Sequence, residues 1–369
     1  MIHFLAPRQS AGVPVDYIAR AGLEQRATVL CYEDVLERGE LPHGLYVFTG
    51  INRLGPAAAR LLASLHAQLE AATGIRPLNH PLHTLRRYEL LRALHRDGLN
   101  RFTAYGAWED YSGVRLPAFV RPREADGGIP TLAHTLQEVE ADVGKALMDG
   151  RGPEDLLVVE FEDTSQDGVF TKYSAYGIGT SVLPWSLDRG TDWVMRRHAA
   201  DLDAAMLMDE ERYVLANPHA EQLARIFSLS GISFGRVDYS VVDGRVVCWE
   251  INTLPLLRRA HGAPSLPPEL DALRQVRRAH FAAGFAAAFA ELLARVPSGG
   301  PVRPDLDARA LAEARAELAA RGATTDAGRE RFRLARALLR PFKPILKPIA
   351  AATLQPLMAR RARRASPKS

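Results

Sequence analysis

The chain has 369 residues, of which 47% are hydrophobic and 24% are charged, and it carries a formal net charge of +4. This length is enough for two or three domains with a substantial buried core, and the composition is that of an ordinary globular protein. No apolar run reaches the roughly 18 residues that a membrane-spanning helix needs. The apolar start of the chain is too short for a secretory signal, so we expect a cytoplasmic protein.

The positive charge is concentrated at the C-terminus. Eight basic residues and no acidic residue lie between Arg340 and the end of the chain. Removing these eight charges from the net +4 leaves the rest of the chain at −4. The basic balance is therefore a property of the tail and says little about what the body of the protein binds.

The chain contains only two cysteines, Cys31 and Cys248. Both lie in apolar runs that are typical of strands. We therefore expect buried free thiols in a reducing compartment rather than a disulfide.

The first 80 residues predict a small open α/β domain. Apolar runs favour strands at residues 2–6, 27–31 and 45–49, and helices at 14–24 and about 56–73. This alternation is typical of a β-α-β arrangement. No Gly-x-Gly-x-x-Gly follows the first strand, so we do not expect a dinucleotide site there.

Residues 81–155 predict a second domain. A helix is expected from about 85 to 97, with Thr84 as its cap and Gly98 at its end. A strand follows at 117–122, and then a glycine turn. Apolar residues from Leu132 to Leu147 recur every three or four positions, which predicts a helix with one buried face.

Residues 156–296 predict a third domain. We expect strands at 156–161 and 168–176, and a helix that starts at Asn217-Pro218 and ends at Gly231. Apolar residues from Leu273 to Leu292 mark a long later helix. Residues 297–369 then contain a linker rich in proline and glycine, a helical segment at 305–321 and the basic tail.

Two strand-like segments near residue 243 carry the strongest chemical signal. The first contains Asp238, the second contains Glu250 and Asn252, and Asp243-Gly244 lies between them. Carboxylate and amide oxygens are hard ligands that suit Mg²⁺. A two-residue turn would place Asp238 and Glu250 on opposite faces, so we predict a loop of odd length, with three residues from Asp243 to Arg245 and a bulge.

The segments Gly-Arg-Val-Asp-Tyr (235–239) and Glu-Ile-Asn-Thr-Leu-Pro (250–255) resemble the metal-binding hairpin of the ATP-grasp superfamily. The resemblance covers about residues 80–260, and within the superfamily the chain is similar to the group of glutathione synthetase and the ribosomal-protein glutamate ligases. It implies an ATP-grasp fold of the α/β (α+β) class. The expected parts are a small N-terminal open α/β domain, a lid domain, a C-terminal core that carries the metal, and a helical basic tail.

The resemblance also implies which residues contact ATP. Arg121, in Phe-Val-Arg-Pro, stands where the family usually has a lysine that reaches the phosphates, and arginine keeps that charge. Glu160 and Phe161 fall at the hinge that holds adenine. Asp163 is preferred for the ribose, with Glu160 and Glu162 as alternatives. The other expected contacts are Arg87, Gly127, Gly128 and Lys172. Each of these side chains could instead be a solvated surface group or part of an ordinary turn.

The implied reaction uses ATP and Mg²⁺, with Mn²⁺ as an alternative metal. A carboxylate is activated as an acyl phosphate and joined to an amine, so the expected partners are small-molecule or peptide acids and amines. Arg121 and Arg236 would support the phosphate charge, and Arg258 and Arg259 would hold a substrate carboxylate, or either pair could be structural. The alternative functions are an ATP-grasp kinase or phosphotransferase and a nucleotide-binding protein without turnover.

The basic tail lies outside the resemblance. Apolar residues between Leu338 and Ile349 alternate with Arg340, Lys343 and Lys347. Such a segment could contact an anionic membrane surface or an acidic partner, and the alternative is a disordered solubilising tail. We expect no nucleic-acid partner, because the tail has no recognised motif and no aromatic platform.

Overall fold

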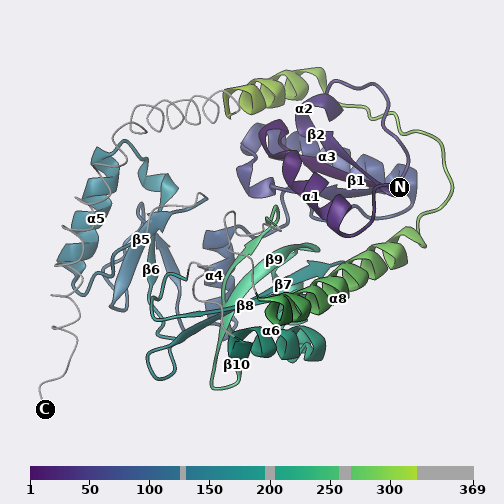
Figure 1. Cartoon of the computed structure of the whole chain (residues 1–369). Helices are drawn as coiled ribbons and strands as arrows, with labels where there is room; N and C mark the ends of the chain where they lie inside the picture. Colours follow the sequence, from purple (N-terminus) through teal and green to yellow (C-terminus); the bar gives the residue numbers. More distant parts are fainter. Residues whose placement is uncertain (125–129, 196–203, 257–266, 322–369) are drawn as a thin grey trace, which may run out of the picture. The chain divides into compact units, whose positions relative to one another are not determined.

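The computed structural model describes residues 1–124, 130–195, 204–256 and 267–321 (Figure 1). Contacts divide the chain into two units, Met1–Arg315 and Ala316–Ser369. The first unit contains every sheet formed by the described residues. Within the described ranges, no helix is both long and apolar enough to cross a bilayer.

The first sheet is parallel and has the strand order β2-β1-β3. It contains β1 (Ile2–Ala6), β2 (Ala27–Cys31) and β3 (Leu45–Phe48). The helices of this region are α1 (Gly12–Arg20), α2 (Tyr32–Val35) and α3 (Pro56–Thr73), with short 3-10 turns at Arg8–Ser10 and Ile51–Arg53. The predicted β-α-β pattern is confirmed, although α1 begins and ends earlier than expected.

The second sheet is antiparallel and has the strand order β4-β6-β5. It contains β4 (Ala104–Gly106), β5 (Ala118–Pro122) and β6 (Leu156–Glu160), and a 3-10 turn at Pro153–Asp155 precedes β6. Helix α5 (Leu136–Met148) packs on β5 and β6 through Val139 and Val143. Helix α4 (Arg87–Arg96) contacts β4 and also β10 of the third sheet.

Two predicted helix starts in this region are wrong. Arg86, not Thr84, precedes α4, and the Thr84 hydroxyl donates instead to the carbonyl of His80 at 3.2 Å. Helix α5 begins at Leu136 rather than near Leu132, because Thr135 and Glu138 form a capping box that fixes the first turn. Gly98 follows the end of α4 with φ of 67°, as a C-terminal glycine should.

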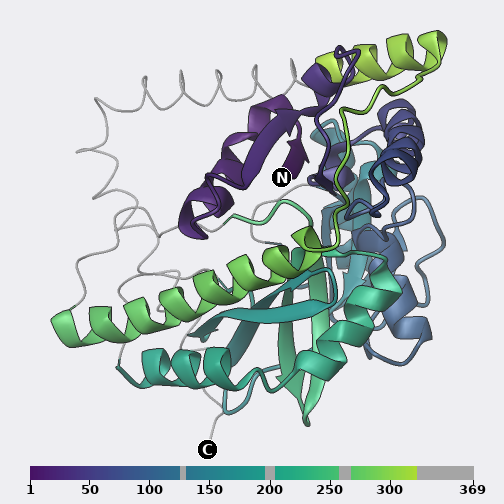
Figure 2. The same ribbon diagram turned by 90° about the vertical axis from the view of Figure 1, so that its right-hand side faces the viewer.

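The third sheet is antiparallel and has the strand order β10-β9-β7-β8. Its strands are β7 (Phe170–Ile178), β8 (Ser181–Gly190), β9 (Phe234–Val242) and β10 (Arg245–Asn252), and its helices are α6 (Ala204–Ala216), α7 (Ala220–Ser230) and α8 (Pro268–Leu293). Helices α6 and α8 run side by side and both contact β8 (Figure 2). The sequence did not reveal β8 or α6.

The predicted start of α7 is also wrong. Asn217 adopts φ of 45° directly after α6, and its amide donates to the carbonyl of Val182 at 2.9 Å. The residue that precedes α7 is His219. Asparagine tolerates the left-handed conformation, so Asn217 ends one helix here instead of capping the next.

The first and third sheets share one hydrophobic core. Phe4 of β1 packs against Phe234 of β9 and Phe289 of α8, with ring centroids 5.6 and 5.5 Å apart. Buried Asn79 adds a polar link, because its amide donates to the carbonyls of Phe48 and Phe234. Strand β9, and with it the β9–β10 hairpin, is therefore anchored directly to the first sheet.

Both cysteines are free in the structure, as predicted. Cys248 is completely buried in β10, whereas Cys31 is only half-buried at the end of β2. Burial raises the pKa of the Cys248 thiol well above its ordinary value. We therefore expect Cys248 to be an unreactive packing residue.

Two glycines that follow helices have the same backbone conformation but different surroundings, so together they test the cost of adding a Cβ at a crowded position. Gly98 and Gly231 have φ of 67° and 66°, but a Cβ on Gly231 would lie 2.6 Å from the carbonyl oxygen of His83, whereas a Cβ on Gly98 would meet nothing within 4 Å. We expect Gly98→Ala to lower the free energy of unfolding by about 1 kcal/mol, and Gly231→Ala by at least about 1 kcal/mol more. Denaturant unfolding of both variants measures the difference, and equal losses would contradict the close approach.

Candidate active site

The β9–β10 hairpin closes with a two-residue turn rather than the predicted three-residue loop. Asp243 and Gly244 both have positive φ, 52° and 72°, and Arg245 pairs with Val242. This is the backbone expected of a type I′ turn, which Asp-Gly favours. The prediction that only an odd loop length would work is therefore wrong.

The predicted pairing of Asp238 with Glu250 is nevertheless present. The register shifts by one residue between Cys248 and Glu250, so that Trp249 is an extra residue in β10. This bulge compensates for the even turn and brings Glu250 opposite Asp238. Asn252 lies two residues beyond Glu250, opposite Arg236.

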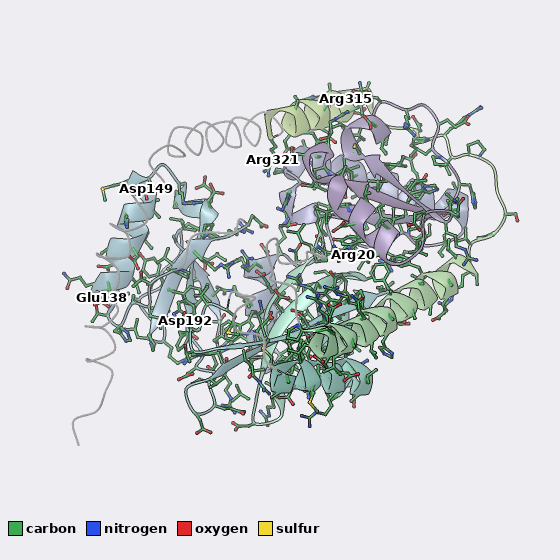
Figure 3. The ribbon with its side chains drawn as sticks, viewed as in Figure 1. Arg20, Glu138, Asp149, Asp192, Arg315 and Arg321 are labelled. Atoms are coloured by element: carbon green, nitrogen blue, oxygen red, sulfur yellow. The ribbon has the colours of Figure 1, made fainter. Side chains whose placement is uncertain are left out.

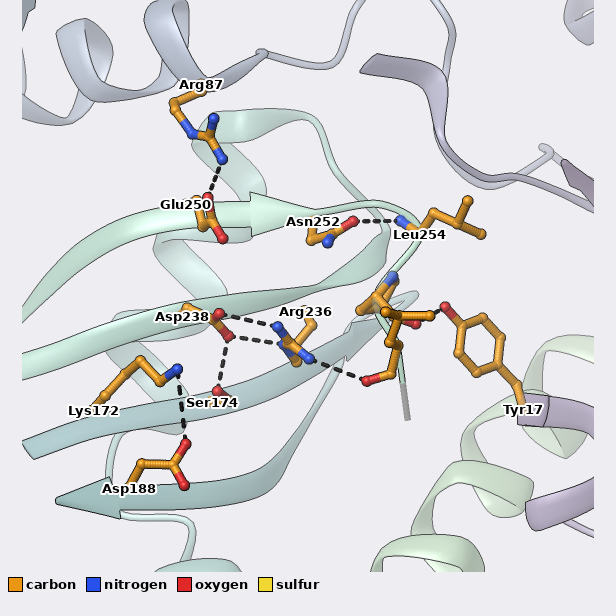
Figure 4. Close-up of polar contacts among 12 residues, drawn as sticks. Tyr17, Arg87, Lys172, Ser174, Asp188, Arg236, Asp238, Glu250, Asn252 and Leu254 are labelled. Carbon is orange, nitrogen blue, oxygen red and sulfur yellow. Dashed lines mark hydrogen bonds and ion pairs between the residues drawn. The ribbon is translucent and has the colours of Figure 1, made fainter. Parts of the chain in front are cut away.

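Asp238 is buried and fully engaged by neighbouring side chains (Figure 4). Arg236 donates to both of its carboxylate oxygens, from Nε at 2.8 Å and from Nη2 at 3.0 Å. The Ser174 hydroxyl of β7 donates to Oδ1 at 2.8 Å. Burial lowers the pKa of Arg236, but the charge of Asp238 outweighs this effect and raises it well above its ordinary value. The two hydrogen bonds from Arg236 therefore fix the position of the Asp238 carboxylate.

Glu250 is held by two arginines, one from helix α4 and one from strand β5. Arg87 of α4 donates to Oε2, and Arg121 of β5 places Nη2 at 3.8 Å from the same oxygen. Arg87 also donates through Nη1 to the carbonyls of Pro122 and Arg123, at 3.4 and 3.1 Å. The Arg87 guanidinium therefore joins Glu250 to the end of β5.

The ionisation of Glu250 predicts a pH dependence of stability. Burial alone would raise the pKa of its carboxyl, but Arg87 and then Arg121 outweigh burial and lower the pKa to about 2 from the ordinary 4.5. Between these values the unfolded chain binds a proton that the folded chain does not, so stability rises with pH in this window. We expect unfolding measured between pH 2 and 4.5 to depend less steeply on pH in Glu250→Gln than in the parent chain, and equal slopes would contradict this assignment.

Asn252 is the third residue on this face of the hairpin that was predicted to hold a metal. Its Oδ1 accepts from the backbone N–H of Leu254 at 2.9 Å, which closes a local turn after β10. Within the described residues, no cluster of three or more histidine, cysteine, aspartate or glutamate side chains could hold a metal ion. Two facing carboxylates and one amide nevertheless suit a small cation with oxygen ligands, one that also takes ligands from phosphate.

A cavity of about 770 Å³ lies against this hairpin, and residues of the second and third sheets line it. Asp238, Glu250, Arg121 and Lys172 contribute to its charged part. Lys172 of β7 places Nζ at 3.8 Å from Asp188 of β8. The predicted residues Arg121, Lys172, Asp238 and Glu250 therefore line one cavity, while Arg87 and Arg236 contact its carboxylates.

Aromatic side chains also line this cavity. Phe119 and Phe161 lie at the second sheet. The centroid of the Trp193 ring is 4.9 Å from that of the Phe119 ring and 5.4 Å from that of the Phe161 ring. Phe161 was predicted at this position, whereas Trp193 was not. A single tryptophan just after a strand that the sequence did not reveal gives no local signal, and only the three-dimensional contacts identify it.

The acidic residues at and after the end of β6 do not lie where we predicted, with Asp163 facing the ribose. Glu160 is buried, and its carboxylate accepts from the backbone N–H groups of Thr103 and Arg115, at 3.2 and 3.0 Å. Asp163 accepts from the N–H of Ser165, and neither Glu160 nor Asp163 lines the cavity. Glu162, one of the alternatives, does line it. Strand β6 ends at Glu160, so the regular alternation of side chains does not extend to Glu162, and the two acids need not share a face.

Four predicted site residues lie outside the described residues. They are Gly127 and Gly128 of the glycine turn, and Arg258 and Arg259 after the hairpin. The basic tail after residue 321 also lies outside them.

No protein-family model matches the chain, and no curated protein matches its sequence. Solved structures do resemble it. D-alanine–D-alanine ligase from Bacillus anthracis, solved with ATP, is 13% identical with a TM-score of 0.46 over 80% of this chain and 97% of that one. A RimK domain ATP-grasp protein from Sphaerobacter thermophilus is 17% identical with a TM-score of 0.43 over 77% and 98%.

The ATP-grasp ligase PsnB, solved with a minimal precursor, Mg and ADP, is 14% identical with a TM-score of 0.45 over 75% of this chain and 96% of that one. All three are named as ligases or ATP-grasp proteins. Because these likenesses are distant, we base function on the residues of the site.

Proposed function

We propose that this protein is an ATP-grasp enzyme that uses ATP and Mg²⁺ to join a carboxylate to an amine. One observation carries the proposal: a single cavity contains two facing carboxylates, two phosphate-compatible cations and an aromatic group. Its volume of about 770 Å³ lies in the range of nucleotide-sized pockets. Glu-x-Asn-Thr-x-Pro and Arg-x-Asp in the facing strands supply the family resemblance.

The aromatic part of the cavity suits the base. Phe161 and Trp193 offer flat apolar faces, and the Glu162 carboxylate nearby can accept from a ribose hydroxyl. Arg115 holds Glu162 through Nη2 at 2.9 Å, which fixes its direction. We therefore assign Glu162 to the ribose in place of Asp163, and Trp193 to the base.

The charged part of the cavity suits the phosphates. Arg121 and Lys172 place two positive charges on its wall, and the planar guanidinium of Arg121 can make two parallel contacts to phosphate oxygens. Asp238, Glu250 and Asn252 would hold Mg²⁺, or Mn²⁺ in its place. A metal held there would supply positive charge that offsets the negative charge developing during phosphoryl transfer.

The proposed reaction has two steps. A substrate carboxylate oxygen attacks the γ-phosphorus of ATP, the bond to the β–γ bridging oxygen breaks, and ADP leaves. An amine then attacks the acyl carbon, phosphate leaves with the bonding electrons, and the amine loses a proton. Arg121 and Lys172 stabilise the negative charge of the first step, and Arg236 holds the Asp238 carboxylate in place.

The proposed domain limits follow the same assignment. Residues 1–80 form the N-terminal α/β domain, 81–155 the lid, 156–296 the core and 297–369 the linker, helix and tail. The lid supplies Arg87 and Arg121, and the core supplies Lys172 and the metal ligands. Both substrates would then meet beside the hairpin. Arg258 and Arg259, which lie outside the described residues, are the candidates from the sequence for holding a carboxylate.

The test is the release of ADP by the full chain with ATP, Mg²⁺ and a panel of amino acids and short peptides, with and without hydroxylamine as the amine. We expect ADP release that depends on both acid and amine, with a hydroxamate as product. Carboxylate labelled with ¹⁸O should pass one labelled oxygen to the released phosphate. Release with an alcohol alone would indicate a kinase, and nucleotide binding without ADP release would indicate a non-catalytic protein.

A further inference from the structure

The outer side of β10 is bonded by an asparagine side chain. β10 lies at one end of the third sheet, so among the described residues no further strand pairs with it there. Helix α4 contacts β10, and side chains lie between the two elements (Figure 3). Asn100, which follows α4, is only 3% exposed and reaches the backbone of β10 at Cys248.

Asn100 pairs with Cys248 as a residue of a neighbouring strand would. Its Nδ2 donates to the carbonyl of Cys248 at 2.8 Å, and its Oδ1 accepts from the N–H of Cys248 at 3.0 Å. Only one orientation of the amide satisfies both backbone groups, so the direction of the side chain is fixed. Cys248 is completely buried, and loss of Asn100 would deprive both groups of these partners away from water.

Cys248 is the last residue before the register of β10 shifts. It pairs with Tyr239, whereas Glu250 pairs with Asp238, so Trp249 is the extra residue between them. The direction in which the Glu250 side chain leaves the strand therefore depends on how the backbone turns at Trp249. The carbonyl that Asn100 holds belongs to the peptide that joins Cys248 to Trp249, so Asn100 fixes the first peptide of the bulge.

The bulge is also held through the side chain of Trp249. The buried Phe102 ring, two residues after Asn100, stacks on the Trp249 ring with centroids 5.0 Å apart and planes inclined by 29°. The indole Nε1 of Trp249 donates to the Ser240 hydroxyl of β9 at 3.2 Å. The segment after α4 therefore contacts both the backbone and the ring at the bulge.

Helix α4 connects these contacts to the Glu250 carboxylate. The N–H of Asn100 donates to the carbonyl of Leu94 at 3.1 Å, which ties Asn100 to the end of the helix. Arg87, the first residue of the same helix, donates to Glu250. The helix and the segment that follows it therefore hold both the carboxylate and the backbone two residues before it.

We propose that Asn100 is a positioning residue for the metal site, acting through Cys248 and the bulge to keep Glu250 opposite Asp238. The inference rests on the proposed function, in which both acids hold Mg²⁺. Asparagine suits this role because its amide donates and accepts as a peptide group does. Ionised aspartate has the same shape but only accepts, and one of its oxygens would face the carbonyl of Cys248.

Asn100→Asp tests the proposal without any need for turnover. Calorimetric titration of the full chain with ADP, over a range of fixed Mg²⁺ concentrations, gives the affinity for the metal and the affinity for ADP without it. We expect the Mg²⁺ affinity to fall about 10–100-fold, as it does when a residue that orients a metal ligand is lost. ADP binding without Mg²⁺ should not change, because Asn100 does not line the nucleotide cavity.

The matched control is Asn217→Asp, at the opposite edge of the same sheet. Asn217 donates to the carbonyl of Val182 in β8 at 2.9 Å, and aspartate tolerates its positive φ. This variant loses the same kind of bond and should keep the parent affinity for Mg²⁺. Asn100→Ser is a milder change for the case that Asn100→Asp does not fold. A water in the freed volume can pair with Cys248, so we expect an intermediate loss of Mg²⁺ affinity.

The double variant Asn100→Asp/Glu250→Gln shows whether Asn100 acts through Glu250. If it does, adding Asn100→Asp to Glu250→Gln weakens Mg²⁺ binding no further. Equal Mg²⁺ affinities in Asn100→Asp and Asn217→Asp, or additive losses in the double variant, would overturn the positioning role while the proposed function stands. ADP binding by the parent chain that does not respond to Mg²⁺ would overturn the proposed metal site and this role with it, so the two failures are distinguishable.

Discussion

Glu250→Gln should lower ATP turnover about 10³-fold or more. The substitution keeps the shape of the side chain but removes the negative charge that faces Asp238, and with it a proposed ligand of the metal. It also leaves Arg87 and Arg121 beside a neutral amide, so both guanidinium groups lose their ion pair with residue 250. Steady-state ADP release, measured with the acid and amine that the ligase assay identifies, gives the loss directly.

The same hairpin supplies the control for this experiment. Asp243→Asn makes the same change from acid to amide at the turn, where the side chain is 75% exposed and pairs with Arg101 at 3.3 Å. Asparagine accepts the positive φ of this position as readily as aspartate. We expect turnover to stay within twofold of the parent chain. A Glu250→Gln protein that keeps more than a tenth of the parent turnover would exclude Glu250 as a metal ligand.

Glu210→Leu should lower the free energy of unfolding by about 3–5 kcal/mol. Glu210 of α6 and Arg277 of α8 form an ion pair in which both side chains are buried, and the Glu210 carboxylate also accepts from the backbone N–H of Leu187 at 3.2 Å. Removing the acid leaves a buried guanidinium without its main counter-charge, and that desolvation is the dominant cost. Denaturant unfolding measures the change.

The double variant Glu210→Leu/Arg277→Met separates the effect of the unpaired charge on stability from the effect of lost packing. It removes both charges and keeps apolar volume, so it should recover most of the stability that the single variant loses. Glu291→Gln is the control, because Glu291 pairs with Arg295 on the exposed side of the same helix and should change stability by less than about 0.5 kcal/mol. A single variant as stable as that control would show that the pair does not hold α6 and α8 together.

Much of the architecture could be predicted from the sequence, because local signals and tertiary structure agree. The first three strands and α3 follow from apolar runs with clear breaks between them. Strand β8 and helix α6 were not predicted. The sequence of β8 contains a proline and two charged residues, and the apolar residues of α6 recur with only a weak helical period. Whether these segments form a strand and a helix therefore depends on how they pack against each other and against α8.

The candidate site was predictable where residue type alone sets the chemistry. Asp238, Glu250, Arg121 and Lys172 lie together as expected, because a short motif places each on a strand of defined direction. The acids after β6 were harder to assign, since Glu162 lies beyond the end of the strand, where alternation no longer predicts which side chain faces the cavity. Trp193 is brought to the cavity only by the tertiary fold.

The extra residue at Trp249 also bears on how this hairpin changes during evolution. It lies between the turn and Glu250, so the alignment of the two acids is decided beside the site and not at the distant tip. A turn that is one residue shorter shifts the register of β10, and one extra residue at Trp249 shifts it back, so that Glu250 still pairs with Asp238. Alignments of related chains should therefore place compensating gaps on either side of residues 246–248 while the two acids stay in the same columns.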